Sequence, residues 1–95
     1  MKGYVVCVYK SISNEEKLKE YAVKAKDAVE KYKGKLLIRD GSFTTNEGDK
    51  SPRTVVIEFP SYDEANSFYN SKEYQEAHSI LKGYTIRHHQ TVEGA

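Results

Sequence analysis

The sequence predicts an α+β domain whose elements follow the order β-α-β-β-α-β, and three observations lead to this prediction. Four stretches are rich in β-branched and aromatic residues, which favour strands. Two stretches place apolar residues at helical spacing, with Lys and Glu on the other faces. Each half of the chain repeats a strand, a capped helix and a strand. This is the ferredoxin-like plan, with two helices on one face of a four-stranded antiparallel sheet, in a single domain over residues 1–95.

The first half begins with a strand and continues with a helix. Residues 3–10, "GYVVCVYK", contain no breaker and predict the strand. Ser13 and Glu16 follow with the spacing of a capping box, which marks the start of a helix. Gly34 stands where a left-handed residue would end that helix. The expected apolar stripe consists of Leu18, Tyr21, Ala22, Ala25, Ala28, Val29 and Tyr32.

The middle of the chain predicts a hairpin. Residues 35–43 and 53–59 have strand composition, and residues 44–52 between them contain Asn, Gly and Pro, which are typical of turns. We place the turn near residues 48–49.

The second half ends with a helix and a strand. Ser61 and Glu64 repeat the capping-box spacing, and Ser71 gives another cap signal. The helix is therefore expected to be broken near residues 70–71. Residues 84–92, "YTIRHHQTV", predict the fourth strand.

Glu58 is an ionisable residue in the middle of the best strand. The strand residues that point to the opposite face from Glu58 are all apolar and should meet the helices. They are Val55, Ile57 and Phe59. Glu58 then points away from the helices. With the turn near residues 48–49, Arg39 lies directly opposite Glu58. The sequence therefore predicts a cross-strand ion pair on the sheet face away from the helices.

The face away from the helices also carries apolar residues. Leu37 and Val56 lie on it, and in one register of the first strand so do Tyr4, Val6 and Val8. A single copy would expose these residues as a contiguous apolar patch, which usually marks an interaction surface. We therefore expect a homodimer packed sheet to sheet. We also expect a cavity with a few polar groups, suited to a small organic ligand.

The composition disfavours several function classes. Fifteen basic and fourteen acidic residues give a net charge of +1, so we expect no nucleic-acid partner and no membrane partner. RNA-recognition domains share the element order, but "TVVIEFP" lacks their basic-Gly-aromatic run. No stretch resembles a secretory signal or a membrane span, and the single Cys7 cannot form an internal disulfide. We expect a cytoplasmic protein.

Several stretches together resemble the domain of unknown function 1330 family, a branch of the dimeric α/β-barrel superfamily. The most specific is "VVIEFPS" followed by "S-x-E-Y-Q", and the others are "KGYV", "EYA", "KYKGKLLIRDG", "EGD" and "VEG". The resemblance covers nearly the whole chain and implies a ferredoxin-like protomer, a homodimer and no established activity. Wider relatives include cofactor-free monooxygenases and lactone isomerases, which suggests a small organic ligand and no cofactor by analogy. Lys50 and Ser51, where members often carry an aromatic residue, depart from the pattern, as does the polar last strand.

Four residues are candidate ligand contacts: Tyr4, Tyr21, Arg39 and Glu58. Arg39 is suited to a carboxylate or an enol, and Glu58 is a candidate catalytic base. A structural ion pair explains these two residues without any function. Tyr21 lies in the helical stripe, so core packing also explains it.

The histidines give one more candidate base. His88 and His89 point to opposite sheet faces, so they cannot bind one metal together, and His88 is the candidate catalytic residue. A solvated strand histidine is the plainer interpretation. Cys7 is most simply a small buried residue. No cluster of His, Cys, Asp and Glu has metal-ligand spacing, so we expect no metal.

Two functions remain after these exclusions. The first is small-molecule binding or cofactor-free catalysis in a pocket of the homodimer. The alternative is a non-enzymatic protein-interaction or regulatory module.

Overall fold

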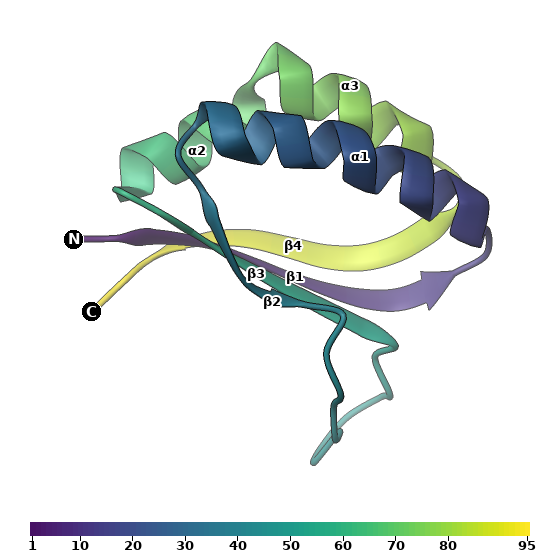
Figure 1. Ribbon diagram of the computed structural model, residues 1–95. Helices are drawn as coiled ribbons and strands as arrows, with labels where there is room; N and C mark the ends of the chain where they lie inside the picture. Colours follow the sequence, from purple (N-terminus) through teal and green to yellow (C-terminus); the bar gives the residue numbers. More distant parts are fainter.

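The computed structural model describes residues 1–95 and contains one antiparallel sheet covered on one face by three helices (Figure 1). The strand order is β2-β3-β1-β4. The elements are β1 (Gly3–Ile12), α1 (Glu15–Lys31), β2 (Lys35–Arg39), β3 (Arg53–Phe59), α2 (Tyr62–Asn70), α3 (Lys72–Leu81) and β4 (Thr85–Glu93). The predicted ferredoxin-like fold is confirmed. The sheet is open rather than a closed barrel, and no helix is long and apolar enough to cross a membrane.

The start of α1 differs from the prediction. Its cap is Asn14, whose Oδ1 accepts a hydrogen bond from the backbone N–H of Lys17 at 3.0 Å. The Ser13 hydroxyl instead donates to the carbonyl of Tyr84 at 3.0 Å. The predicted Ser13 capping box is therefore wrong, because Ser13 ties the end of β1 to the segment before β4.

The end of α1 also shifts by one residue. The left-handed residue is Lys33, with φ of 62°, and not Gly34. A glycine is nevertheless required at position 34 for space. A Cβ there would lie 2.8 Å from side-chain atoms of Phe59 and Val29.

The second helical region divides at Ser71, as the sequence predicts. Ser71 ends α2 and caps α3, with extended φ and ψ of −68° and 151°. Its hydroxyl donates to the carbonyl of Phe68 at 2.7 Å and accepts from the backbone N–H of Tyr74 at 3.1 Å. The break lets both aromatic residues face the core, where their ring centroids are 4.6 Å apart.

The central strand β1 separates the two faces of the sheet. Val5, Cys7 and Tyr9 point toward the helices and are buried, whereas Val6 and Val8 are half-buried on the open face. The covered face and the helices enclose one hydrophobic core. Its other members are Leu18, Tyr21, Ala25, Ala28, Val29, Ile57, Phe59, Ala65, Phe68, Tyr74, Ala77 and Leu81.

Candidate functional site

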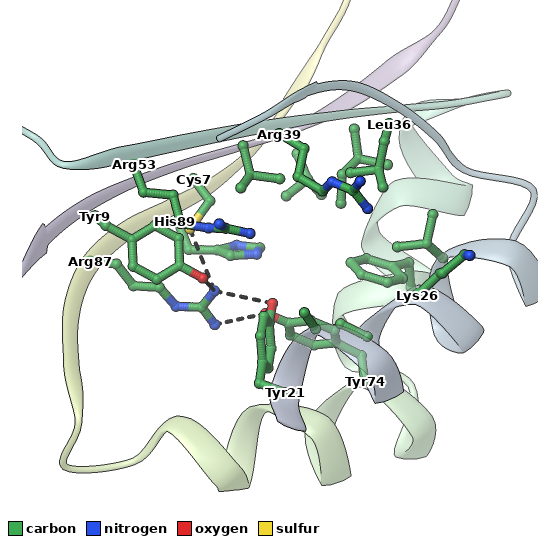
Figure 2. Close-up of a pocket in the computed structure, with 17 residues that line it drawn as sticks. Cys7, Tyr9, Tyr21, Lys26, Leu36, Arg39, Arg53, Tyr74, Arg87 and His89 are labelled. Carbon is green, nitrogen blue, oxygen red and sulfur yellow. Dashed lines mark hydrogen bonds between the residues drawn. The ribbon is translucent and has the colours of Figure 1, made fainter. Parts of the chain in front are cut away.

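A cavity of about 60 Å³ lies between the helices and the covered face of the sheet (Figure 2). One ordered water needs only ~10–15 Å³ on a comparable measure. The walls are mostly apolar and come from all four strands and all three helices. They include Val5, Ala22, Ala25, Leu36, Val55 and Ile57. The cavity is thus large enough for part of a small organic molecule.

The charged residues of the cavity are all basic. The fifteen basic residues of the chain are twelve lysines and three arginines. All three arginines line the cavity, namely Arg39, Arg53 and Arg87, whereas only one lysine does, namely Lys26. The lining contains no Asp and no Glu. A chain that is nearly neutral overall therefore concentrates its guanidinium groups in one hollow.

Arg87 lies on β4 directly opposite Tyr9 of β1, and its guanidinium enters the inner part of the cavity (Figure 2). Its Nη2 donates to the Tyr74 hydroxyl at 2.7 Å. Its Nη1 donates to the hydroxyls of Tyr9 and Tyr21 at 3.3 Å and to the Cys7 Sγ at 3.5 Å. No carboxylate lies within 4.0 Å of this guanidinium. Arg87 is therefore held by neutral groups alone.

The acceptors of Arg87 do not cancel its charge. Burial raises the pKa of Tyr9 to about 12 and raises the pKa values of Tyr21 and Tyr74 above their ordinary value. Burial also raises the pKa of the Cys7 thiol, an effect that Arg87 partly opposes. All four groups are neutral at pH 7, and a guanidinium does not lose its proton in proteins. The inner part of the cavity thus carries a full positive charge.

Arg53, at the start of β3, brings a second guanidinium close to the first. Its side chain is only 12% exposed and lies over the Tyr9 ring, with 5.6 Å between the guanidinium carbon and the ring centroid. One terminal nitrogen is 3.6 Å from the exposed carboxylate of Asp40. The Nε is buried and has no hydrogen-bond partner. Buried donors are nearly always paired, so this nitrogen is an unusual feature of the cavity wall.

Arg39 reaches the cavity because β2 contains a bulge, and the predicted pairing of Arg39 with Glu58 is wrong. Leu36 pairs with Ile57, but after an extra residue at Leu37 the register shifts and Arg39 pairs with Val55. The bulge puts Leu36 and Arg39 on the same face although they are three residues apart. A regular strand would have put Arg39 on the open face, as the sequence analysis assumed.

Glu58 lies on the open face, outside the cavity lining. Its cross-strand neighbours are Lys35 of β2 and Tyr4 of β1. The Tyr4 hydroxyl donates to Glu58 Oε2 at 3.1 Å, which raises the Tyr4 pKa, and Lys2 Nζ is 4.0 Å from Oε1. Of the four candidate ligand contacts, the cavity therefore contains Tyr21 and Arg39 and does not contain Tyr4 or Glu58.

The two adjacent histidines lie on opposite faces, as predicted, and it is His89 that lines the cavity. Burial, followed by the charge of Arg87, lowers the pKa of His89 to about 3. Its ring lies 4.8 Å from that of Tyr69 and 5.8 Å from that of Tyr74. The candidate base His88 is exposed on the open face, within 2.9 Å of the Gln90 side chain.

Neither Arg53 nor Arg87 is among the site residues predicted from the sequence. The composition contained one signal. Twelve of the fifteen basic residues are lysines, so the three positions that use arginine stand out. Arg87 and His89 also share a parity in the last strand. No group of three or more His, Cys, Asp or Glu side chains is arranged to hold a metal ion.

Comparison with solved structures identifies the class of protein. The protein RPA0582 of unknown function from Rhodopseudomonas palustris matches with a TM-score of 0.77 and 11% identity, over 99% of this chain and 82% of that one. A dimeric ferredoxin-like protein of unknown function from Bacteroides fragilis matches with a TM-score of 0.58 and 18% identity, over 98% and 96% of the two chains. At these identities the likeness shows the fold, which is that of ferredoxin-like α+β proteins.

One structural relative has a described activity. SnoaB from Streptomyces nogalater, a cofactor-independent oxygenase, matches with a TM-score of 0.66 and 10% identity, over 98% of this chain and 92% of that one. A comparison with curated protein sequences finds no match. The chain belongs to the family described as Domain of unknown function (DUF1330), whose model matches residues 2–95. The family assignment carries no activity with it.

Proposed function

We propose that this protein binds a small organic anion in the cavity between its helices and its sheet, and that it does so as a homodimer. The observation that carries the proposal is the guanidinium of Arg87, which has no carboxylate within 4.0 Å. Leaving a charge in the interior without a counter-charge costs several kcal/mol, by a general estimate of about 3–5 kcal/mol when one partner is missing. A ligand carboxylate would supply the missing partner.

The hydrogen bonds of Arg87 support an incoming anion rather than a finished structural network. Its Nη1 has two hydrogens and three neutral acceptors, all at 3.3–3.5 Å. The two contacts with hydroxyl oxygens, at 3.3 Å, exceed the usual range for an N–H···O hydrogen bond, sulfur is a weak acceptor, and charge-assisted bonds are shorter and stronger. A carboxylate could therefore replace the weak acceptors while Tyr21 and Tyr74 keep their mutual hydrogen bond of 2.9 Å.

The walls of the cavity support an organic ligand over a bare inorganic ion. Twelve of the seventeen lining residues are hydrophobic. Sites for small molecules typically combine such walls with a few polar groups that fix the orientation of the ligand. An inorganic anion would leave the aliphatic part of the cavity unused.

The cavity supports binding more than it supports catalysis. With a pKa of about 3, His89 is a weak base in the empty cavity. General bases are usually tuned to a pKa near the working pH. The other candidate bases, Glu58 and His88, lie on the open face. A reaction in the cavity would depend on His89 and the tyrosine hydroxyls. The protein shares its fold with a cofactor-independent oxygenase, but a shared fold is not evidence of a shared reaction.

The homodimer is supported by the open face of the sheet. Val6, Val8 and Val56 are half-buried on it, and Ile38 and Ile86 are exposed at 47% and 64%. An apolar sheet face left in water usually marks an interface. Two proteins of the same fold are described as dimeric, one from Bacteroides fragilis and one from Thermobifida fusca.

Isothermal titration calorimetry with matched acids and amides tests the binding proposal. Hexanoate and benzoate should bind, and hexanamide and benzamide should not. The variant Arg87→Met should weaken acid binding by about 100-fold, as expected for the loss of a bidentate charged contact. Lys19→Met removes the same charge from an exposed site on α1 and should change nothing. Equal binding of acids and amides would overturn the proposal.

A further inference from the structure

The basic groups of the cavity form two sets, one at each end. Figure 2 shows Arg53 and Arg87 at one end, beside Tyr9, and Arg39 with Lys26 toward the other end. The first pair, which we call the inner pair, is largely buried. The second pair, Arg39 and Lys26, which we call the outer pair, is exposed and therefore marks the mouth of the cavity.

The outer pair has no partner within the chain. Neither Arg39 nor Lys26 forms an ion pair with any carboxylate. On α1, Lys17, Lys19 and Lys31 do pair with carboxylates, whereas Lys24, which lies outside the cavity, is unpaired like Lys26. Arg39 points to the mouth only because of the bulge after Leu36. Bulges are often found beside functional sites, where they redirect a side chain.

An apolar side chain stands between the arginines of the two pairs. Val55 lies two residues after Arg53 on β3 and directly opposite Arg39 of β2, and Ala22 and Leu36 add apolar surface to the same cavity. A ligand with one acidic group at the inner pair would leave the outer pair facing solvent. A ligand with a second acidic group would satisfy both pairs and bury its middle against aliphatic surface.

We propose that the ligand is a dianion with an acidic group at each end of a short apolar body, such as an α,ω-dicarboxylate. This inference rests on the proposed function and names the class of its ligand. The inner carboxylate contacts Arg87 and Arg53, and the outer carboxylate contacts Arg39 and Lys26. A cavity with four basic residues and no acidic one selects charge −2 over charge −1 by electrostatic complementarity.

Calorimetry on the full-length protein with dicarboxylates and monocarboxylates of equal length tests this inference. The probes are adipate with hexanoate and suberate with octanoate. At least one dicarboxylate should bind about tenfold or more tightly than its partner, which is the gain expected from one more charge-assisted contact. Equal affinities within both pairs would overturn the inference and leave the proposed function standing.

Variants at the two ends sharpen the test. Arg39→Met should weaken dicarboxylate binding about tenfold more than monocarboxylate binding, whereas Arg87→Met should weaken both classes by a similar factor. Arg39 is exposed, so its variant is expected to fold, and circular dichroism checks this. Lys19→Met is the charge-matched control. A uniform loss in Arg39→Met would contradict the two-ended ligand, and no binding by any acid would overturn this inference and the proposed function together.

Discussion

The two faces of the sheet are built from alternate residues of the same strands, yet the charged residues on them differ in whether they have a partner of opposite charge. On the open face Glu58 has partners within the chain, Tyr4 at 3.1 Å and Lys2 at 4.0 Å. On the covered face Arg87 is also partly buried, and it has only neutral hydrogen-bond partners. A charge on a strand is therefore less informative than the groups that balance it. A balanced charge is explained by the fold alone, and the unbalanced charge of Arg87 is the basis of our proposal of an anionic ligand.

The same contrast recurs in two adjacent residues of β4. His88 is exposed on the open face, whereas His89 is enclosed between the aromatic rings of the helices and the charge of Arg87. One residue step along a strand moves a side chain from water to the cavity. Variants of such neighbouring residues can therefore test whether the two faces differ as described.

The largest effect is expected from a charge on the open face. Val56→Glu places a carboxylate in the proposed dimer interface, where it would be buried without a partner. Dimer affinity should fall by on the order of a thousandfold, which is about 4 kcal/mol. Light scattering across a concentration series measures the change. Val23→Glu is the matched control on the outer surface of α1, where Val23 is 69% exposed, and it should remain dimeric.

The next effect is the pH dependence caused by His89. Its pKa is lowered to about 3, whereas in the unfolded chain it stays near its ordinary value of 6.5. Between these values the unfolded state binds more protons, so the free energy of unfolding falls as the pH falls. The expected slope is about 1 kcal/mol per pH unit below pH 6.5. Urea unfolding at pH 7, 6 and 5 measures it.

Two histidine variants isolate this slope. His89→Gln removes the titrating group, so the pH dependence between pH 7 and 5 should become flatter. His88→Gln changes an exposed histidine on the other face and should keep the slope of the parent protein. Identical slopes in both variants would mean that the covered face does not control the titration. The groups around His89 that also carry or gain charge are Arg87, then His78 and, as the smallest contribution, His88.

A smaller effect is expected for the stability of Arg87→Met in the absence of ligand. The substitution removes an unbalanced charge, and the Tyr21 and Tyr74 hydroxyls still bond each other at 2.9 Å. Replacing a buried charge by an apolar side chain is often neutral or stabilising, here by up to about 2 kcal/mol. Chemical unfolding tests this. A loss of 2 kcal/mol or more would show that Arg87 is a structural residue and not a ligand contact.

The smallest effect is expected for Glu58→Gln. Its side chain is 25% exposed, and the amide can still accept the Tyr4 hydrogen bond. Stability should change by less than about 1 kcal/mol, as for most exposed ion pairs. Titration of hexanoate should give the affinity of the parent protein. A clear loss of ligand affinity would mean that the open face takes part in binding.

The fold was predictable because its signals are local. Period-two strands, cap residues and helical stripes each specify one element, and the break at Ser71 followed from a cap signal alone. The errors at Ser13 and Gly34 are displacements of one residue, where a neighbouring side chain took the expected role. Which of two adjacent residues caps or ends the helix depends on tertiary contacts, and the order of residues in the chain does not reveal these contacts.

The site was less predictable because it depends on two non-local features. The bulge after Leu36 reverses the face of Arg39, and no residue in "KLLIRD" marks it. The last strand also lacks a regular alternation of apolar and polar residues, since Ile86 lies on the open face while Arg87 lies on the covered face. A strand that contributes basic side chains to a cavity breaks the rule by which burial is inferred from hydrophobicity.

If the covered face of the sheet holds a cationic cavity for a small organic anion, the arginine side chains of the cavity must respond to such a ligand. Nuclear magnetic resonance can follow this response, because the three Nε–H signals of this chain all come from that cavity. Titration with adipate should shift the signals of Arg53 and Arg87 to a saturable end point, and titration with adipamide should leave them in place. Signals that stay unmoved by adipate, or that move equally with the neutral amide, would contradict the claim.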